Sequence, residues 1–202
     1  SSGAAYGYHP DNPAAINEDW PLRGNPEFAY SDHKRQIEEL LARYRASHPA
    51  LSQFVFRVCT VIGANTDNQI TALFEKPRLL AIRGAASPFS FIWDGDLVEC
   101  LARALASERP GIYNLAGDGA LTVQEIAQRL GKPCVEVPAW LLRTALALLR
   151  PLGLTRYGPE QVNFLRYRPV LCNARLKRVF GFTPRYSSRE AFERWALAHG
   201  AA

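Results

Sequence analysis

The chain has 202 residues, of which 48% are hydrophobic and 21% charged, and its formal net charge is +5. This composition predicts one ordinary domain, or two small lobes, with a real hydrophobic core, and it excludes wholesale disorder. The longest apolar run, residues 140–149, is interrupted by Arg143 and is too short to cross a bilayer, so we expect a cytoplasmic protein without a membrane span.

The four cysteines lie far apart and form no CxxC motif and no pairing with histidine. They are Cys59, Cys100, Cys134 and Cys172. This spacing favours free thiols in a reducing compartment over a zinc site or a disulfide framework, and we predict no metal site.

Hydrophobic periodicity predicts helices and strands that alternate along the chain. Residues 27–47 carry an apolar stripe at helical spacing and end before Pro49, as an amphipathic helix does. Residues 53–62, QFVFRVCTVI, are rich in β-branched and aromatic side chains and predict one buried strand, which Gly63 ends. The remaining predicted elements, in chain order, are a short helix at 70–74, a strand at 79–82, an extended segment at 89–92, a helix at 94–106, a strand at 111–116, a helix at 123–130 capped by Thr122, and helices at 140–149, 159–164, 173–180 and 188–199.

This alternation predicts an α/β fold with a parallel sheet and a helix-rich C-terminal lobe. The glycine-rich loop GxGxxG, with which such folds cradle the pyrophosphate of a dinucleotide, does not occur in the sequence. We therefore expect either that the protein binds no dinucleotide or that this loop lies upstream of Ser1.

Basic residues are concentrated in one part of the chain. Between Arg143 and Arg185 there are nine arginines and lysines and one acidic residue, Glu160. This excess of positive charge fits an anionic substrate or an acidic partner, and it fits a solvated arginine surface equally well. No nucleic-acid-binding motif accompanies it, so we expect no nucleic-acid partner.

A tyrosine and a lysine lie about one helical turn apart in the predicted helix at 27–47. Tyr30 and Lys34 leave the same face of that helix, so both can reach one ligand. The pKa of a free phenol lies near ~10, and a neighbouring ammonium favours the phenolate, which makes such a tyrosine usable as a proton donor and acceptor. The lysine can reach a ribose hydroxyl at the same time. The alternative is a surface tyrosine beside a solvated lysine.

Six segments of the chain carry recognisable sequence motifs. They are SSGAAYG (1–7), YSDHK (30–34), RVCTVIG (57–63), FSFIWDGDLVE (89–99), GIYNLAGDGALTVQEIA (111–127) and RLKRVFGFTPRYSSREAFERW (175–195). In this order they resemble the extended short-chain dehydrogenases/reductases of the NAD-dependent epimerase/dehydratase type. The resemblance covers nearly the whole chain but only the second half of such an enzyme.

The resemblance implies the second half of a Rossmann-type domain that binds NAD or NADP, with NAD preferred, and a smaller substrate-binding lobe. The cofactor part comprises residues 1–63 and 89–116, and the lobe comprises residues 64–88 and 117–202. It implies an oxidoreductase, epimerase or dehydratase that acts on a hydroxyl or carbonyl of a small, sugar-like substrate. The alternative is a non-catalytic dinucleotide-binding or assembly module of the same fold.

The resemblance also implies roles for individual residues. Tyr30 would transfer a proton to or from the substrate oxygen, Ser2 would donate a hydrogen bond to that oxygen, and Lys34 would bind the nicotinamide ribose and lower the pKa of the tyrosine. The implied cofactor-binding residues are Tyr30, Lys34, Thr60, Val61 and Gly63. The implied substrate-binding residues are Ser2, Tyr6 and Phe89. A homodimer that forms through the helix of Tyr30 and Lys34 is expected as well.

The chain departs from the family pattern at one position. Phe89 stands where members that act on sugar nucleotides commonly carry an arginine that grips the pyrophosphate. A phenyl ring cannot supply the forked donors of a guanidinium, which argues against a nucleotide-sugar substrate. Because the glycine-rich half is absent from this sequence, we expect the chain alone to be inactive and to bind NAD or NADP weakly.

Overall fold

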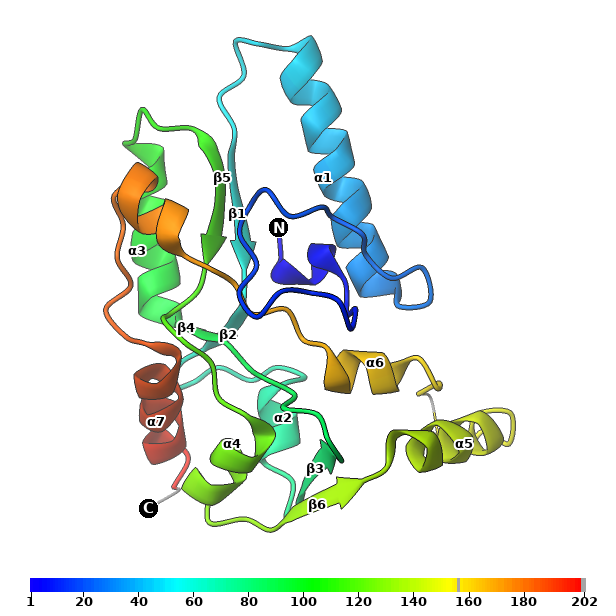
Figure 1. Cartoon of the computed structure of the whole chain (residues 1–202). Helices are drawn as coiled ribbons and strands as arrows, with labels where there is room; N and C mark the ends of the chain where they lie inside the picture. The colour runs from blue at the N-terminus through cyan, green and yellow to red at the C-terminus, as the bar shows by residue number, and fades with distance from the viewer. Residues whose placement is uncertain (156, 201–202) are drawn as a thin grey trace.

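The computed structural model describes residues 1–155 and 157–200 and contains strands that pair in parallel (Figure 1). The strands are β1 (Phe54–Val58), β2 (Thr60–Ile62), β3 (Leu79–Ile82), β4 (Phe91–Trp93), β5 (Gly111–Leu115) and β6 (Cys134–Val137). They form the pairs β1–β5, β2–β4 and β3–β6. Parallel strands need long crossover connections, and here helices provide most of them, as the alternation in the sequence predicts. The α/β fold class is confirmed.

Helices lie between the strands in the order of the chain and form most of its C-terminal part (Figure 1). They are α1 (Ala29–Ser47), α2 (Thr71–Phe74), α3 (Asp94–Leu105), α4 (Val123–Arg129), α5 (Ala139–Leu149), α6 (Gln161–Arg166) and α7 (Ser188–Ala198), with a 3₁₀ turn η1 (Gly3–Tyr6) and a π-helix η2 (Leu176–Phe180). Most bounds agree with the predicted ones to within two residues. None of the helices in the described ranges is long and apolar enough to span a membrane.

The single strand predicted at residues 53–62 is wrong, because the chain changes its partner at Cys59. β1 pairs with β5 up to Val58, where the register is Val58 with Leu115. The Cys59 N–H still donates to the Leu115 carbonyl at 3.1 Å, and from Thr60 onward β2 pairs with β4 instead. The apolar pattern continues through this change because both strands carry apolar and β-branched residues, so periodicity alone does not reveal it.

Two further elements differ from the prediction. β6 was not predicted, because it has only four residues and lies between Pro133 and Pro138, a pattern typical of a loop. The helix predicted at 173–180 becomes a π-helix over its last five residues. It ends at Gly181, whose φ of +86° lies in the left-handed region that favours glycine.

The β1–β5 pair separates two differently packed faces. Neighbouring strand residues point to opposite sides, so Phe56 and Arg57 leave β1 in opposite directions. Phe56 packs with Tyr113, Phe180 and Cys100 in an apolar cluster that joins the pair to α3 and η2. Arg57 points to the other side, where α1 and η1 lie. This second face holds the candidate site.

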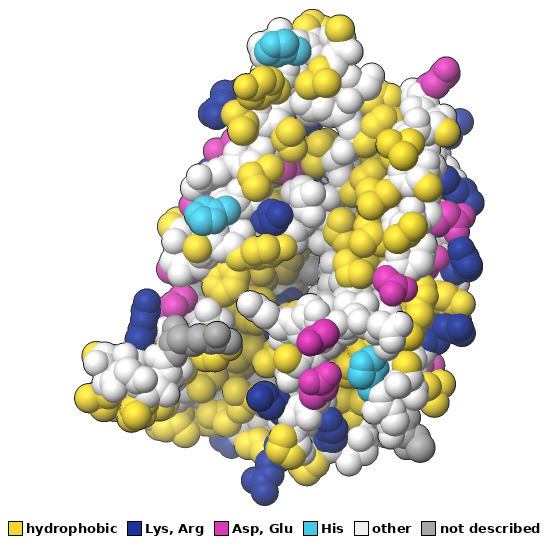
Figure 2. Space-filling view, turned by 180° about the vertical axis from the view of Figure 1, so that it is seen from behind, with side chains coloured by type: hydrophobic (Ala, Val, Ile, Leu, Met, Phe, Trp, Pro, Cys, Tyr) yellow, Lys and Arg dark blue, Asp and Glu magenta, His cyan; other side chains and the backbone are white. Residues whose placement is uncertain are grey.

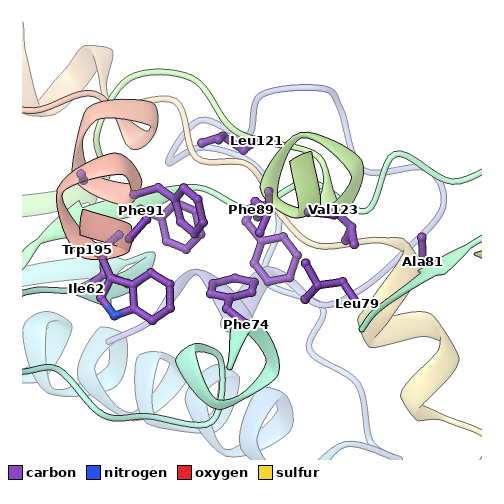
Figure 3. Packing of buried hydrophobic residues seen from close by; sticks show 14 residues of the cluster. Ile62, Phe74, Leu79, Ala81, Phe89, Phe91, Leu121, Val123 and Trp195 are labelled. Atoms are coloured by element: carbon purple, nitrogen blue, oxygen red, sulfur yellow. The ribbon is translucent and has the colours of Figure 1, made fainter. Parts of the chain in front are cut away.

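A second apolar cluster fills the region between α2, α4, α7 and the strands β2 to β4 (Figure 3). Phe74 lies at its centre, with its ring 5.2 Å from that of Phe89 and 5.7 Å from that of Trp195. Helix α4, at the edge of this cluster, starts with the predicted cap. The Thr122 hydroxyl accepts from the Glu125 N–H at 3.1 Å in a capping box. The cluster thereby fixes the position of Phe89, one of the predicted substrate-binding residues.

Candidate active site

The first seven residues contain Ser2 and are called the serine loop here. This loop lies beside the end of β1. Ser2 is extended, pairs with Val58 through an isolated parallel bridge, and caps η1 by accepting a hydrogen bond from the Ala4 N–H at 3.2 Å. Its hydroxyl also lies 3.4 Å from the Val58 carbonyl. Ser2 therefore stands at the carboxyl end of a parallel strand, the edge at which α/β folds commonly bind their ligands.

Tyr30 and Lys34 lie in the first two turns of α1 and face the same side of the helix. The Lys34 ammonium is 5.5 Å from the centroid of the Tyr30 ring, within the range of a cation–π contact. The Tyr30 side chain is 53% exposed. Within the described ranges, Lys34 makes no salt bridge, so its ammonium remains available to a ligand. The predicted proximity of the two side chains is confirmed; their roles stay a prediction.

A buried hydrogen bond attaches the serine loop to this helix. The hydroxyl of Ser31, the residue after Tyr30, donates to the Ala4 carbonyl at 2.6 Å. Both groups are out of solvent, where a lost hydrogen bond is costly. The contact fixes η1, and with it Ser2, against the first turn of α1.

A buried ion pair ties α1 to β1. Arg57 donates two parallel hydrogen bonds to Glu38, at 2.9 and 2.7 Å, and both side chains are only 4% exposed. The remaining guanidinium nitrogen donates to the Tyr6 hydroxyl at 2.7 Å and to the Glu18 carbonyl at 2.9 Å. A single guanidinium thus holds the serine loop, α1, β1 and the loop around Glu18 in fixed relation.

Tyr6, a predicted substrate-binding residue, is part of this network. Its hydroxyl donates to Asn114 on β5 at 2.9 Å and accepts from Arg57. Burial raises the pKa of the Tyr6 phenol to about 12, although the Arg57 charge opposes the shift. Through these contacts Tyr6 connects the serine loop to β1 and β5. Its contact with substrate stays a prediction.

Sequence reasoning missed Glu38, Arg57 and Asn114, which together position the site. The sequence did contain a signal for two of them, because Arg57 interrupts one apolar strand and Asn114 interrupts another. A polar residue in the middle of a buried strand needs a buried partner, so each pointed to a hydrogen-bond network. The sequence does not say which residue that partner is.

The predicted cofactor-binding residues lie along and after β2. Thr60 and Val61 are half-buried and pair with β4, and Gly63 is buried against the start of α3. A Cβ on Gly63 would lie 1.9 Å from a carboxylate oxygen of Asp94, so a larger residue would require that side chain to move. The close approach explains why a glycine ends β2. Binding of the cofactor by these residues stays a prediction.

Phe89, where an arginine was expected from the family pattern, is buried. Its N–H donates to the Leu121 carbonyl at 2.8 Å, and its ring contacts Phe74 on one side. The guanidinium of Arg168 lies over the ring at 3.9 Å from the centroid. An arginine is therefore present at this place in space, although it comes from another segment of the chain.

The chain is similar to uncharacterized curated proteins and to solved structures of enzymes. The uncharacterized protein Rv0501 of Mycobacterium tuberculosis is 24% identical over 200 residues, which is 99% of this chain and 53% of that protein. The chain thus spans about half the length of the curated relatives it matches. A dTDP-glucose 4,6-dehydratase from Bacillus anthracis in complex with NAD aligns with a TM-score of 0.70 and 17% identity, over 98% of this chain and 60% of the dehydratase chain.

The UDP-glucose 4-epimerase of Thermus thermophilus in complex with NAD gives a TM-score of 0.68 at 22% identity, over 100% of this chain and 63% of the epimerase chain. At these identities the comparison shows that the structures share the fold. The model of the NAD dependent epimerase/dehydratase family matches residues 1–116, more than half of the chain. The chain belongs to the NAD dependent epimerase/dehydratase family.

Proposed function

We propose that the protein containing this chain is an NAD-dependent oxidoreductase of the epimerase/dehydratase type, which acts on a hydroxyl or carbonyl of a small substrate. The observation that carries the proposal is the position of the Lys34 ammonium, 5.5 Å from the ring of an exposed Tyr30 and free of any salt bridge within the described ranges. Family membership and the NAD complexes among the similar structures support it.

Each of the three proposed catalytic residues has a separate task. The Tyr30 phenol gives a proton to the substrate oxygen or takes one from it, and the positive charge of Lys34 favours the phenolate. The Ser2 hydroxyl donates to the same oxygen and stabilises the charge that develops there. The bound nicotinamide supplies the hydride transfer. Lys34 holds the nicotinamide ribose, with Thr60, Val61 and Gly63 beside it.

We also propose that one set of segments binds the cofactor and the other binds the substrate. Residues 1–63 and 89–116 carry Ser2, Tyr30, Lys34 and the β2 end, and they form the cofactor part. Residues 64–88 and 117–202 contribute α4 to α7 and form the substrate lobe. A homodimer through the outer face of α1 is part of the proposal, because Ile37, Leu40 and Tyr44 expose apolar side chains there.

The substitution Tyr30→Phe in the full-length protein tests the proposed function. It removes the hydroxyl that moves the proton, so turnover should fall about 100- to 10,000-fold while NAD binding persists. The matched control is Tyr44→Phe, on the same helix and 50% exposed, which should keep turnover unchanged. Near-normal turnover in Tyr30→Phe would contradict the proposal, whereas NAD binding without turnover in the wild type favours the non-catalytic module.

A further inference from the structure

Helix α5 projects from the edge of the molecule, next to α6 (Figure 1). The structure describes all of its residues, Ala139–Leu149, and none of them is buried. Yet the helix is hydrophobic at every position except Arg143 and Thr144. A helix that is apolar on nearly every side normally lies in a protein core or in lipid. The exposure of α5 therefore indicates a partner that covers it.

The outward surface of α5 consists of large apolar side chains. Trp140, Leu141 and Leu148 fall on one side of the helix, at positions i, i+1 and i+8. The turn that follows the helix adds Leu152 and Leu154 to the exposed residues. Apart from Leu141, these side chains are between 64% and 71% exposed. Soluble monomers rarely leave so much contiguous apolar surface in water.

Only positive charge accompanies this apolar surface. Residues 138–158 include three arginines and no aspartate or glutamate. Arg143 and Arg150 lie seven residues apart on one flank of α5, and both are exposed. The long apolar stem of an arginine covers hydrophobic surface while its guanidinium reaches a polar layer. An anionic bilayer matches both parts, because it offers acyl chains to the leucines and phosphates to the guanidinium groups.

Contacts with α6 hold the helix in place without using up its positive charge. The Arg143 guanidinium donates to the side-chain oxygen of Asn163 at 2.6 Å, and the Arg150 guanidinium lies 3.7 Å from Glu160. Asn163 is neutral, so it leaves the charge of Arg143 uncompensated. A guanidinium has five N–H donors, so an exposed arginine with one such contact can still donate to a lipid phosphate.

The other exposed apolar surfaces of the molecule differ from this one in charge. Helix α1 carries Asp32 and Glu39 among its residues, and helix α3 carries Asp94 and Glu99. Carboxylates at these places would be repelled by anionic headgroups, whereas a protein surface with arginines or lysines can pair with them. The charge pattern thus favours a protein partner for α1 and a lipid surface for α5.

We infer that α5 and the turn after it attach the protein to the surface of an anionic membrane. The helix lies along the bilayer, with Trp140, Leu148 and Leu152 at the boundary between headgroups and acyl chains and with Arg143 and Arg150 at the lipid phosphates. Its eleven residues measure about 16 Å, roughly half of the hydrocarbon thickness, so it rests on the bilayer and does not cross it. The inference goes beyond the proposed function and does not depend on it.

The experiment is co-sedimentation of the full-length protein with vesicles of phosphatidylcholine alone and of phosphatidylcholine with about 30% phosphatidylglycerol. The anionic vesicles should bind at least about tenfold more tightly, and about 0.5 M salt should remove most of that difference. Leu148→Glu should weaken the binding at least about tenfold, because it loses leucine burial and adds a repelled charge. The matched control is Leu105→Glu on α3, which is also exposed and should bind as the wild type does. Equal Tm values show that both variants are folded.

Tryptophan fluorescence locates the contact at α5. Trp140 is exposed, whereas Trp195 is buried in the apolar cluster of Figure 3, so a blue shift on binding to anionic vesicles reports on Trp140. Trp140→Phe should still sediment with the vesicles but lack the shift. A wild type that stays in the supernatant, a Leu148→Glu variant that binds equally, or equal binding to neutral vesicles overturns the inference. None of these readouts needs turnover, so loss of the proposed function would leave the result unchanged.

Discussion

The most tightly held residue of the site is Arg57, and its energetics follow from burial. Charges that are removed from water are tolerated when they are paired and hydrogen-bonded, and each guanidinium nitrogen of Arg57 donates to at least one acceptor. Removing one partner leaves an uncompensated charge, which is far more costly than losing the same pair at the surface. The pair is therefore a sensitive point for stability.

The substitution Glu38→Gln measures this cost. It leaves the Arg57 charge buried without its counter-ion, so the free energy of unfolding should fall by about 3–5 kcal/mol in denaturant titration. Glu39→Gln, one residue along α1, removes an exposed ion pair with Arg35 and should cost less than about 1 kcal/mol. Equal losses in the two variants would show that Glu38 does not act through a buried charge.

At the scale of elements, a second ionic contact attaches the loop after β5 to the C-terminal part. Asp118 accepts from Lys177 at 2.6 Å and from the Asn173 side chain at 2.8 Å. The hydrogen bond from Lys177 is the main reason that the pKa of the Asp118 carboxyl lies below its ordinary value, and Asn173 adds to the effect. A depressed folded-state pKa stabilises the protein above the unfolded pKa, near ~4, and that stabilisation is lost as the pH falls through the lower value.

Asp118→Asn should therefore flatten the fall of Tm with pH below about pH 4, because the variant has no carboxylate to protonate there. The measurement is Tm across the acid range, with Asp67→Asn as control, since Asp67 is exposed in a loop. The control should follow the wild-type curve. If Tm falls as steeply with decreasing pH in Asp118→Asn as in the wild type, the ion pair is excluded as a source of acid sensitivity.

The sequence predicts elements well where the pattern is local. The helix α1 and the Thr122 cap of α4 are predicted from local signals, and both are confirmed, although the apolar stripe of α1 is exposed and its buried residues are Ser31 and Glu38. The change of partner at Cys59 and the strand β6 depend on residues far away in sequence, so no local pattern predicts them. The site divides in the same way: helical spacing brings Tyr30 and Lys34 together, whereas the partner of Arg57 and the contact of Arg168 with the Phe89 ring appear only in three dimensions.

At the scale of the whole molecule, one face exposes an unusual amount of apolar surface. Figure 2 shows hydrophobic side chains gathered along two columns of this face, over α1 and over α3. An apolar groove of about 460 Å³ lies at α3, lined among others by Phe54, Phe56, Leu101 and Leu105. Monomeric proteins rarely expose large contiguous apolar patches, so the apolar column over α1 supports the proposed association through that helix.

Leu40→Glu tests that association. A charge at the centre of the α1 face should favour the monomer, because burying it in an interface costs desolvation energy. Sedimentation velocity of the full-length protein should show a dimer for the wild type and a monomer for Leu40→Glu. Leu197→Glu, on α7 and 70% exposed, is the control for added charge and should remain dimeric. A dimer in both variants would exclude α1 as the interface.

The parallel pairing of the strands has a consequence for synthesis on the ribosome. Every pair joins distant residues, from Thr60 with Phe91 at the shortest to Phe54 with Gly111 at the longest. β1 thus leaves the ribosome well before β5, its partner in this pair, is made, and at ordinary elongation rates this wait lasts roughly 3–11 s. During that interval Arg57 can already pair with Glu38, because α1 is made before β1.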